Sequence, residues 1–123
     1  MRVVGLGFRA RASLGSIEEL FRRLQVIPAL TLALPEFREE HPVVHELQAL
    51  GFRVTLVPEA ALNGLSTFTR SPRILARYGT GSLAEACALV AAGPAARLVL
   101  PRVMSADRCA TAALAQSVER PDP

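Results

Sequence analysis

The chain has 123 residues and a formal net charge of +3, and 50% of its residues are hydrophobic. This composition excludes an intrinsically disordered chain, and no apolar segment approaches the length of a transmembrane helix. The 14 basic residues are all arginine and are scattered along the chain, a pattern that favours an acidic small molecule over nucleic acid or a membrane as the partner.

The chain shows no internal repeat and no linker long enough to separate two domains. The apolar run after Met1 is too short for a secretory signal. We therefore expect a cytoplasmic protein with one domain over residues 1–116 and a flexible tail over residues 117–123. In that compartment Cys87 and Cys109, which are far apart in the sequence, should be reduced and buried.

The first predicted element is a buried strand over residues 3–6, which Gly5 and Gly7 would end in a G-x-G turn. A dinucleotide-binding turn requires a third glycine where this chain has Ala10, so the Rossmann pattern is incomplete.

The chain then alternates between helix and strand patterns up to residue 62. Ser16 and Glu19 form a capping box, and Pro42 suits the first position of a helix. The predicted elements are a helix over 16–24, a strand over 29–34, a helix over 42–50, a strand over 52–57 and a short helix over 58–62.

A short helix is predicted over residues 72–78. Ser71 suits its N-cap, Pro72 its first helical position, and Gly79 its end. Ser71 could instead contact a ligand, and both roles stay open.

A further helix is predicted over residues 83–92, where the sequence is apolar nearly all round and should be buried on more than one side. Ser82 and Glu85 form a capping box at its start. As a cap, Glu85 needs no further function. As a general base, it would need a pKa raised by partial burial.

The loop before this helix contains Gly79, Gly81 and Ser82. Backbone amides and the helix dipole meet at a helix N-terminus and favour an anion such as a carboxylate. The alternative is a well-capped turn without a ligand.

The last two strands are predicted over residues 97–100 and 109–115. Because strands alternate with helices, the sequence predicts an α/β fold, a three-layer α/β/α arrangement with a mostly parallel sheet of about five strands. Ligands of such sheets bind beyond the carboxyl ends of the strands. This rule places near one rim Gly7, Phe8, Arg9, Thr31, Arg102 and the Gly79–Ser82 loop.

Arg9, Arg11 and Arg102 are the candidate ligand-facing cations, with an ordinary exposed basic surface as the alternative. His41 and His45 are spaced so that they can share one helix face, but no further ligand lies nearby in the sequence. We therefore predict no metal site and no cofactor.

Five short motifs resemble a known family. They are G-L-G-F-R from Gly5, the strand end at Thr31, the stretch from Ser71 through Y-G-T-G-S-L-A-E-A-C-A-L, L-V-L-P-R from Leu98 and T-A-A-L-A from Thr111. In this order they resemble the C-terminal domain of the cobalamin-biosynthesis protein CbiG and its free-standing relatives of CobE type. The resemblance covers roughly residues 3–115.

The resemblance implies a role in cobalamin biosynthesis, with a precorrin or corrin tetrapyrrole as ligand and other enzymes of the pathway as further partners. Two classes of function remain. The first is a protein that binds a corrin intermediate without turnover. The second is a hydrolase of CbiG type, which opens the lactone of (cobalt-)precorrin-5A with release of acetaldehyde.

The chain departs from the family pattern at positions that carry chemistry. The family cysteine after G-x-G is Phe8 here, and two family lysines are replaced, one by Phe37 or Arg38 and one by Arg102. A catalytic role for that cysteine or those lysines would be lost in this chain. If the positions bind carboxylates, Arg11, Arg38 and Arg102 can supply the charge.

Overall fold

The structure is a computed structural model that describes residues 1–117. The predicted tail over residues 117–123 therefore lies, apart from Ser117, outside the described residues. The elements in chain order are β1 (Arg2–Phe8), α1 (Leu14–Leu24), β2 (Thr31–Pro35), the 3₁₀ helix η1 (Glu36–Arg38), α2 (Pro42–Ala49), β3 (Arg53–Val57), α3 (Glu59–Leu62), α4 (Pro72–Tyr78), α5 (Leu83–Ala92), β4 (Arg97–Met104) and β5 (Ala110–Gln116).

The five strands form one sheet in the order β3-β2-β1-β5-β4. Strands β1, β2 and β3 are parallel, whereas β5 is antiparallel to both of its neighbours, β1 and β4. The predicted α/β fold with five strands is confirmed, but the prediction of a mostly parallel sheet is wrong because the sheet is mixed. Residues 105–109 alone join β4 to β5, and a connection this short forms a hairpin, because a parallel crossover needs a dozen or more residues.

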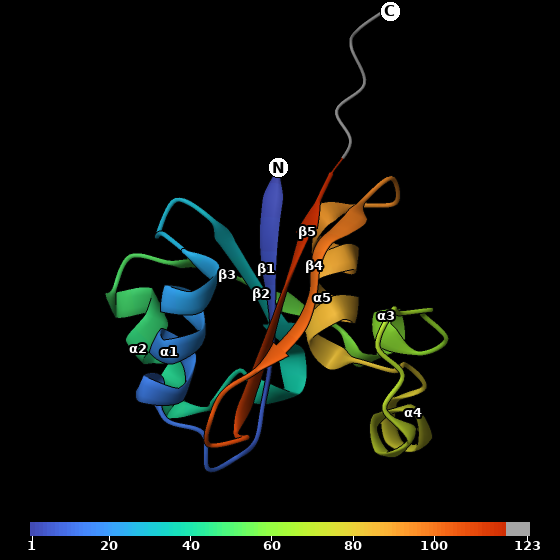
Figure 1. Ribbon diagram of the computed structural model, residues 1–123, viewed down its shortest axis with the longest axis horizontal. Coiled ribbons are helices and arrows are strands. Elements are labelled where there is room, and N and C mark those ends of the chain that lie inside the picture. Colours follow the sequence, from blue (N-terminus) through green and yellow to red (C-terminus); the bar gives the residue numbers. More distant parts are fainter. Residues whose placement is uncertain (118–123) are drawn as a thin grey trace, which may run out of the picture.

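Helices cover the two faces of the sheet: α1 and α2 lie on one face and α5 on the other (Figure 1). Alternate residues of β1 supply the two cores, since successive strand side chains point to opposite faces. Val4, Leu6 and Phe8 pack with α1 and α2, and Val3 packs with α5.

The two glycines of β1 lie where the structure leaves little room for a Cβ atom. A Cβ added at Gly5 would lie 1.8 Å from the carbonyl oxygen of Ala84, and one at Gly7 would lie 2.9 Å from Oγ1 of Thr111. The prediction of a G-x-G turn is therefore wrong. Both glycines lie within the strand, where Gly5 makes room for the backbone of α5 and Gly7 for the side chain of Thr111.

Helix α1 begins earlier than predicted. Its N-cap is Ser13, whose Oγ accepts a hydrogen bond from Ser16 N, while Ser16 Oγ accepts one from Ser13 N. The carboxylate of Glu19 turns away from the helix start and accepts hydrogen bonds from the backbone N–H of Ala106. No helix within residues 1–117 is both long and apolar enough to cross a membrane.

Candidate functional site

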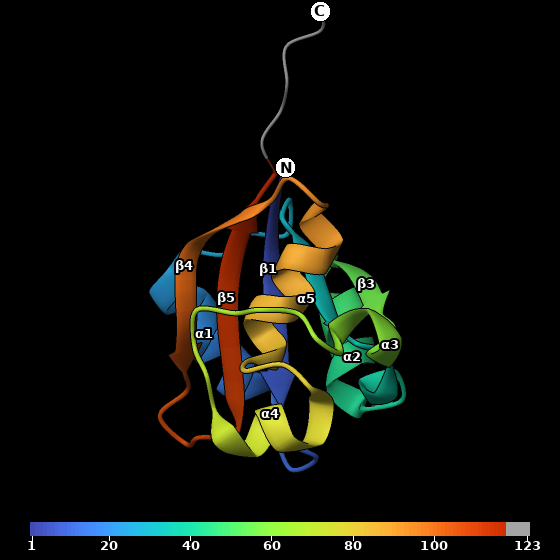
Figure 2. The same cartoon turned by 90° about the vertical axis from the view of Figure 1, so that its right-hand side faces the viewer.

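A pocket of about 580 Å³ lies at the end of the sheet where β1 ends and β5 begins. Helix α4 lies at the level of this end, on the side of α5 (Figures 1 and 2), and forms one wall of the pocket. The lining residues are Gly7, Phe8, Arg9, Arg38, Ser71, Arg73, Ile74, Arg77, Tyr78, Leu83, Arg102, Arg108, Cys109, Ala110 and Thr111.

The lining is strongly positive. Six of its residues are arginines, which come from the segment directly after β1, from η1, α4 and β4, and from the β4–β5 turn, and none of the described lining residues is Asp or Glu. Arginine stays charged at any physiological pH and binds a carboxylate with two parallel hydrogen bonds. The lining can therefore supply several cations to a negatively charged group.

The α4 wall presents Arg73 and Arg77, which are four residues apart and so share one helix face. Next to Arg77, the ring of Tyr78 stacks on that of Phe37, with 5.2 Å between the ring centroids and 2° between the ring planes. The guanidinium carbon of Arg77 lies 5.3 Å from the centroid of the Tyr78 ring. These contacts join α4 to η1 at one edge of the pocket.

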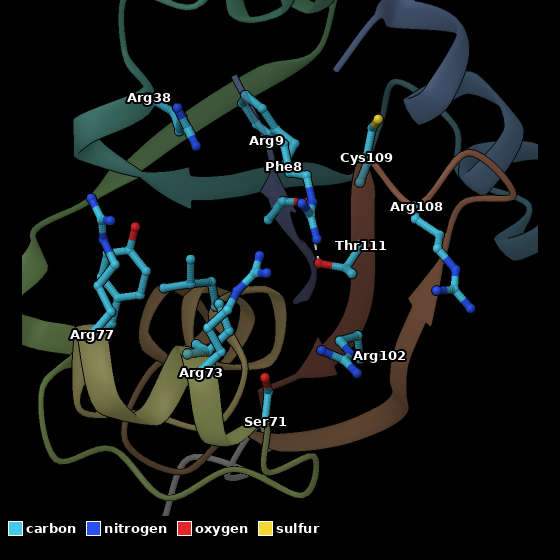
Figure 3. A pocket seen from close by; sticks show the side chains of 15 residues that line it. Phe8, Arg9, Arg38, Ser71, Arg73, Arg77, Arg102, Arg108, Cys109 and Thr111 are labelled. Atoms are coloured by element: carbon cyan, nitrogen blue, oxygen red, sulfur yellow. Dashed lines mark hydrogen bonds between the residues drawn. The ribbon is translucent and has the colours of Figure 1, made fainter. Parts of the chain in front are cut away.

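The part of the pocket next to η1 is lined by Arg38 and Phe8. The guanidinium carbon of Arg38 lies 5.9 Å from the ring centroid of Phe8 and 5.4 Å from that of Phe37. Phe8 is also in edge contact with His41, at 5.0 Å between ring centroids. Aromatic rings thus hold the Arg38 side chain beside the pocket, and Figure 3 shows it pointing inward from the η1 side.

The structure brings some of the predicted site residues together and leaves others apart. Five of them line the pocket: Gly7, Phe8, Arg9, Ser71 and Arg102, of which the last four are labelled in Figure 3. The six that do not are Arg11, Thr31, Gly79, Gly81, Ser82 and Glu85.

Thr31 lies at the wrong end of the sheet. It is the first residue of β2 and pairs with Val3 at the start of β1, whereas the pocket lies beyond Phe8. Arg11 is also turned elsewhere. Hydrogen bonds from the hydroxyls of Ser105 and Ser16 and from the backbone of Cys109 lower the pKa of Asp107 to about 2, and the charge of Arg11 makes the smallest contribution.

The glycine loop before α5 is closed by the protein itself. Thr80 and Ser82 are buried, and the carbonyl oxygen of Gly81 accepts a hydrogen bond from Ser71 N. A Cβ at Gly81 would lie 2.4 Å from the carbonyl oxygen of Thr69. The contacts of this loop thus correspond to the well-capped turn, the alternative to an anion site.

Glu85 is fully buried, and its carboxylate braces the loop before α4 rather than completing a capping box. Ser82 Oγ does accept from Glu85 N, but the carboxylate accepts from Thr69 N at 2.8 Å, from the Thr69 hydroxyl and from Arg102 N at 2.9 Å. The Glu85 carboxylate therefore holds neighbouring segments of the chain together, and Glu85 is not among the residues that line the pocket.

The histidines and cysteines have the following positions. Nδ1 of His41 accepts from Val43 N, which leaves Nε2 to donate to the carbonyl oxygen of Ala10 at 2.8 Å. Cys87 and Cys109 are unpaired and buried, as predicted, and Cys109 lines the pocket. Within residues 1–117, no cluster of three or more His, Cys, Asp or Glu side chains could hold a metal ion.

The pocket residues with polar groups that sequence reasoning missed include Arg73, Arg77, Tyr78 and Arg108. Arg73 and Arg77 had a signal, because two arginines at i and i+4 on a short helix must share a face. Tyr78 lies on α4, which has no buried residue. Arg108 had no signal, since its position depends on the turn between β4 and β5.

Comparisons with known proteins agree with one another. A family model described as cobalamin synthesis G C-terminus matches residues 2–115. The structure of CobE, a protein from the cobalamin (vitamin B12) biosynthetic pathway, superposes with a TM-score of 0.81 at 26% identity, over 98% of this chain and 93% of that chain. The cobalamin biosynthesis protein ChiG from Agrobacterium tumefaciens gives 0.71 at 26% identity, over 97% of this chain and 100% of that chain.

A third structure, described as a cobalamin biosynthesis protein G homologue from Sulfolobus solfataricus, is similar in fold. Its TM-score is 0.68 at 21% identity, over 95% of this chain but 37% of that longer chain. A comparison with curated protein sequences finds no match.

Proposed function

Because the chain belongs to the cobalamin synthesis G C-terminus family, we propose that it serves cobalamin biosynthesis by binding a precorrin or corrin intermediate in the arginine-lined pocket. The observation that carries this proposal is the convergence of six guanidinium groups on one cavity. Intermediates of this class carry several acetate and propionate carboxylates around a macrocycle. Each carboxylate is a partner for one arginine fork.

The apolar part of the lining supports a flat ligand. Phe8, Ile74, Tyr78 and Leu83 contribute apolar surface between the arginines. Small-molecule sites combine such walls with a few placed charges and have volumes of roughly 300–1,000 Å³. The pocket has a volume within this range, so the ring of a tetrapyrrole would contact the apolar side chains while its acids reach the arginines.

The alternative function is hydrolysis of the CbiG type, which the residues of the pocket support less well than binding without turnover. Glu85 is the residue predicted as a general base, but its carboxylate accepts hydrogen bonds from the backbone N–H groups of Thr69 and Arg102. Ser71 and Cys109 line the pocket and carry a hydroxyl and a thiol, but within residues 1–117 neither group forms a hydrogen bond with a basic side chain that could activate it. Binding without turnover is therefore the function that the described lining supports best.

The test is a spectroscopic titration with hydrogenobyrinic acid and with its neutral amidated form. The acid should shift its visible spectrum on binding and should bind less tightly as salt rises, because the exposed charges are screened. The double variant Arg9→Gln/Arg102→Gln should bind about 10- to 100-fold more weakly.

The matched control is Arg53→Gln/Arg97→Gln, which removes the same charge from exposed positions at the other end of the sheet. It should bind like the wild type. If the amidated form binds as tightly as the acid, or if both double variants lose the same affinity, the carboxylate-binding pocket is the wrong explanation.

A further inference from the structure

Arg108 has a backbone conformation that arginine rarely adopts. Its φ is 62°, in the left-handed region, and it follows Ser105, Ala106 and Asp107 in the turn between β4 and β5. Arg108 N donates to the carbonyl oxygen of Ser105 at 2.9 Å, which closes the turn. Glycine is the common residue at such a position because a side chain there is sterically disfavoured.

The turn does not depend on the arginine side chain. Asp107 holds it, since its carboxylate accepts hydrogen bonds from the hydroxyls of Ser105 and Ser16 and from Cys109 N. Among the described residues, the guanidinium of Arg108 forms no hydrogen bond or ion pair. It is exposed and lies at the rim of the pocket, on the side of Arg102 (Figure 3).

We propose that Arg108 is a ligand-binding residue, and that the chain has arginine where the backbone conformation favours glycine because the guanidinium binds a carboxylate of the ligand. The inference rests on the proposed function and makes it more specific. In Figure 3, Arg108 and Arg102 lie on one side of the pocket, whereas Arg38 and Arg77 lie on the other. The ligand is then a molecule with carboxylates on opposite edges, as on the periphery of a macrocycle.

Gln25 provides a matched control for the backbone effect. It has a φ of 55° at the end of α1, where it is exposed and does not line the pocket. Any gain in stability from placing glycine in the left-handed region should appear at both positions, whereas a loss of ligand should appear only at Arg108.

The experiment compares the thermal melts and the hydrogenobyrinic acid titrations of the wild type, Arg108→Gly, Arg108→Ala, Gln25→Gly and Gln25→Ala. At each position, the Gly variant should melt roughly 2–5 °C above the Ala variant, because alanine keeps the strained φ. Both Arg108 variants should bind the acid about three- to tenfold more weakly than the wild type. Both Gln25 variants should bind like the wild type.

The outcomes separate this inference from the function that it rests on. If the wild type binds the acid and Arg108→Gly binds it equally well, the role of Arg108 is wrong and the pocket proposal stands. If Arg108→Gly does not melt above Arg108→Ala, arginine carries no backbone penalty there and the inference is also overturned. A wild type that does not bind the acid overturns the proposed function and this inference together.

Discussion

Glu85 Oε2 accepts a hydrogen bond from the backbone N–H of Arg102, with 2.9 Å between the two atoms. The same carboxylate accepts from Thr69, so one buried group joins α5, β4 and the loop that leads to α4. Two walls of the pocket, the Arg102 strand and the α4 segment, are therefore positioned by a side chain that does not touch the pocket.

The first prediction concerns this brace. Glu85→Gln replaces one acceptor oxygen by an NH₂ group, so either Thr69 N–H or Arg102 N–H loses its acceptor. The free energy of unfolding should fall by about 1–3 kcal/mol, because a buried donor without a partner keeps its desolvation cost. Glu46→Gln, at an exposed position of α2, is the control and should be neutral. Urea unfolding measures both.

A general base at Glu85 would give a different result. The Gln variant would then keep the wild-type unfolding free energy and lose only turnover of a precorrin. That combination would contradict the structural role.

The second prediction concerns the close contact between β1 and α5. A Cβ at Gly5 would meet the backbone of Ala84 at 1.8 Å, and backbone cannot move aside as a side chain can. Gly5→Ala should therefore destabilise the fold by about 3 kcal/mol or more. Gly15→Ala, in the first turn of α1 with only the Ser13 hydroxyl at 3.5 Å, should instead stabilise it by about 0.5–1 kcal/mol. Equal melting temperatures for the two variants would contradict this packing.

The elements of the fold were predictable because they depend on local patterns. Pro72, Gly79 and Ser82 mark helix ends wherever the helices pack, and the predicted ranges agree with α4 and α5 within a residue or two. The predicted direction of β5 was wrong because the rule that strands alternate with helices assumes a crossover before every strand. The connection over residues 105–109 is too short for a crossover and indicates an antiparallel pair of strands.

Three residues of the site were predictable because they lie where a strand ends. Gly7, Phe8 and Arg9 line the pocket because the carboxyl end of β1 lies there. Glu85 was misread since a capping box and a buried brace have the same sequence pattern, and the donors from Thr69 and Arg102 come from remote segments. Contacts of this kind depend on tertiary structure and have no local signature.

The third prediction concerns thiol chemistry. Burial raises the pKa of Cys87 to about 12 from 9.0, so this thiol is protonated at pH 8, and the thiolate is the reactive form. Iodoacetamide at pH 8 should leave Cys87 unmodified in the native protein and alkylate it in urea, as read by peptide mass spectrometry. Rapid native labelling would contradict its burial.

The same shift has a consequence for stability. The unfolded thiol ionises above pH 9, whereas the folded thiol does not until about pH 12. The contribution of the buried Cys87 thiol to the free energy of unfolding is therefore complete below pH 9 and is lost as the pH rises from 9 to 12. The difference in melting temperature between the wild type and Cys87→Ala should shrink over that window, and a constant difference would contradict the assignment.

The fourth prediction concerns α4, which has no buried residue and carries two of the six arginines of the pocket. Without a ligand, Arg73 and Arg77 face the like charges of Arg9 and Arg102 across the cavity, which favours local opening of the helix. A bound polyanion should replace this repulsion with attraction worth about 1 kcal/mol, so amide exchange in α4 should slow roughly fivefold, while exchange in α5 stays unchanged. In Arg73→Gln/Arg77→Gln the helix should exchange more slowly in the free protein and respond little to the ligand. If the ligand protects α4 equally in the wild type and in this variant, the order of α4 does not depend on its arginines.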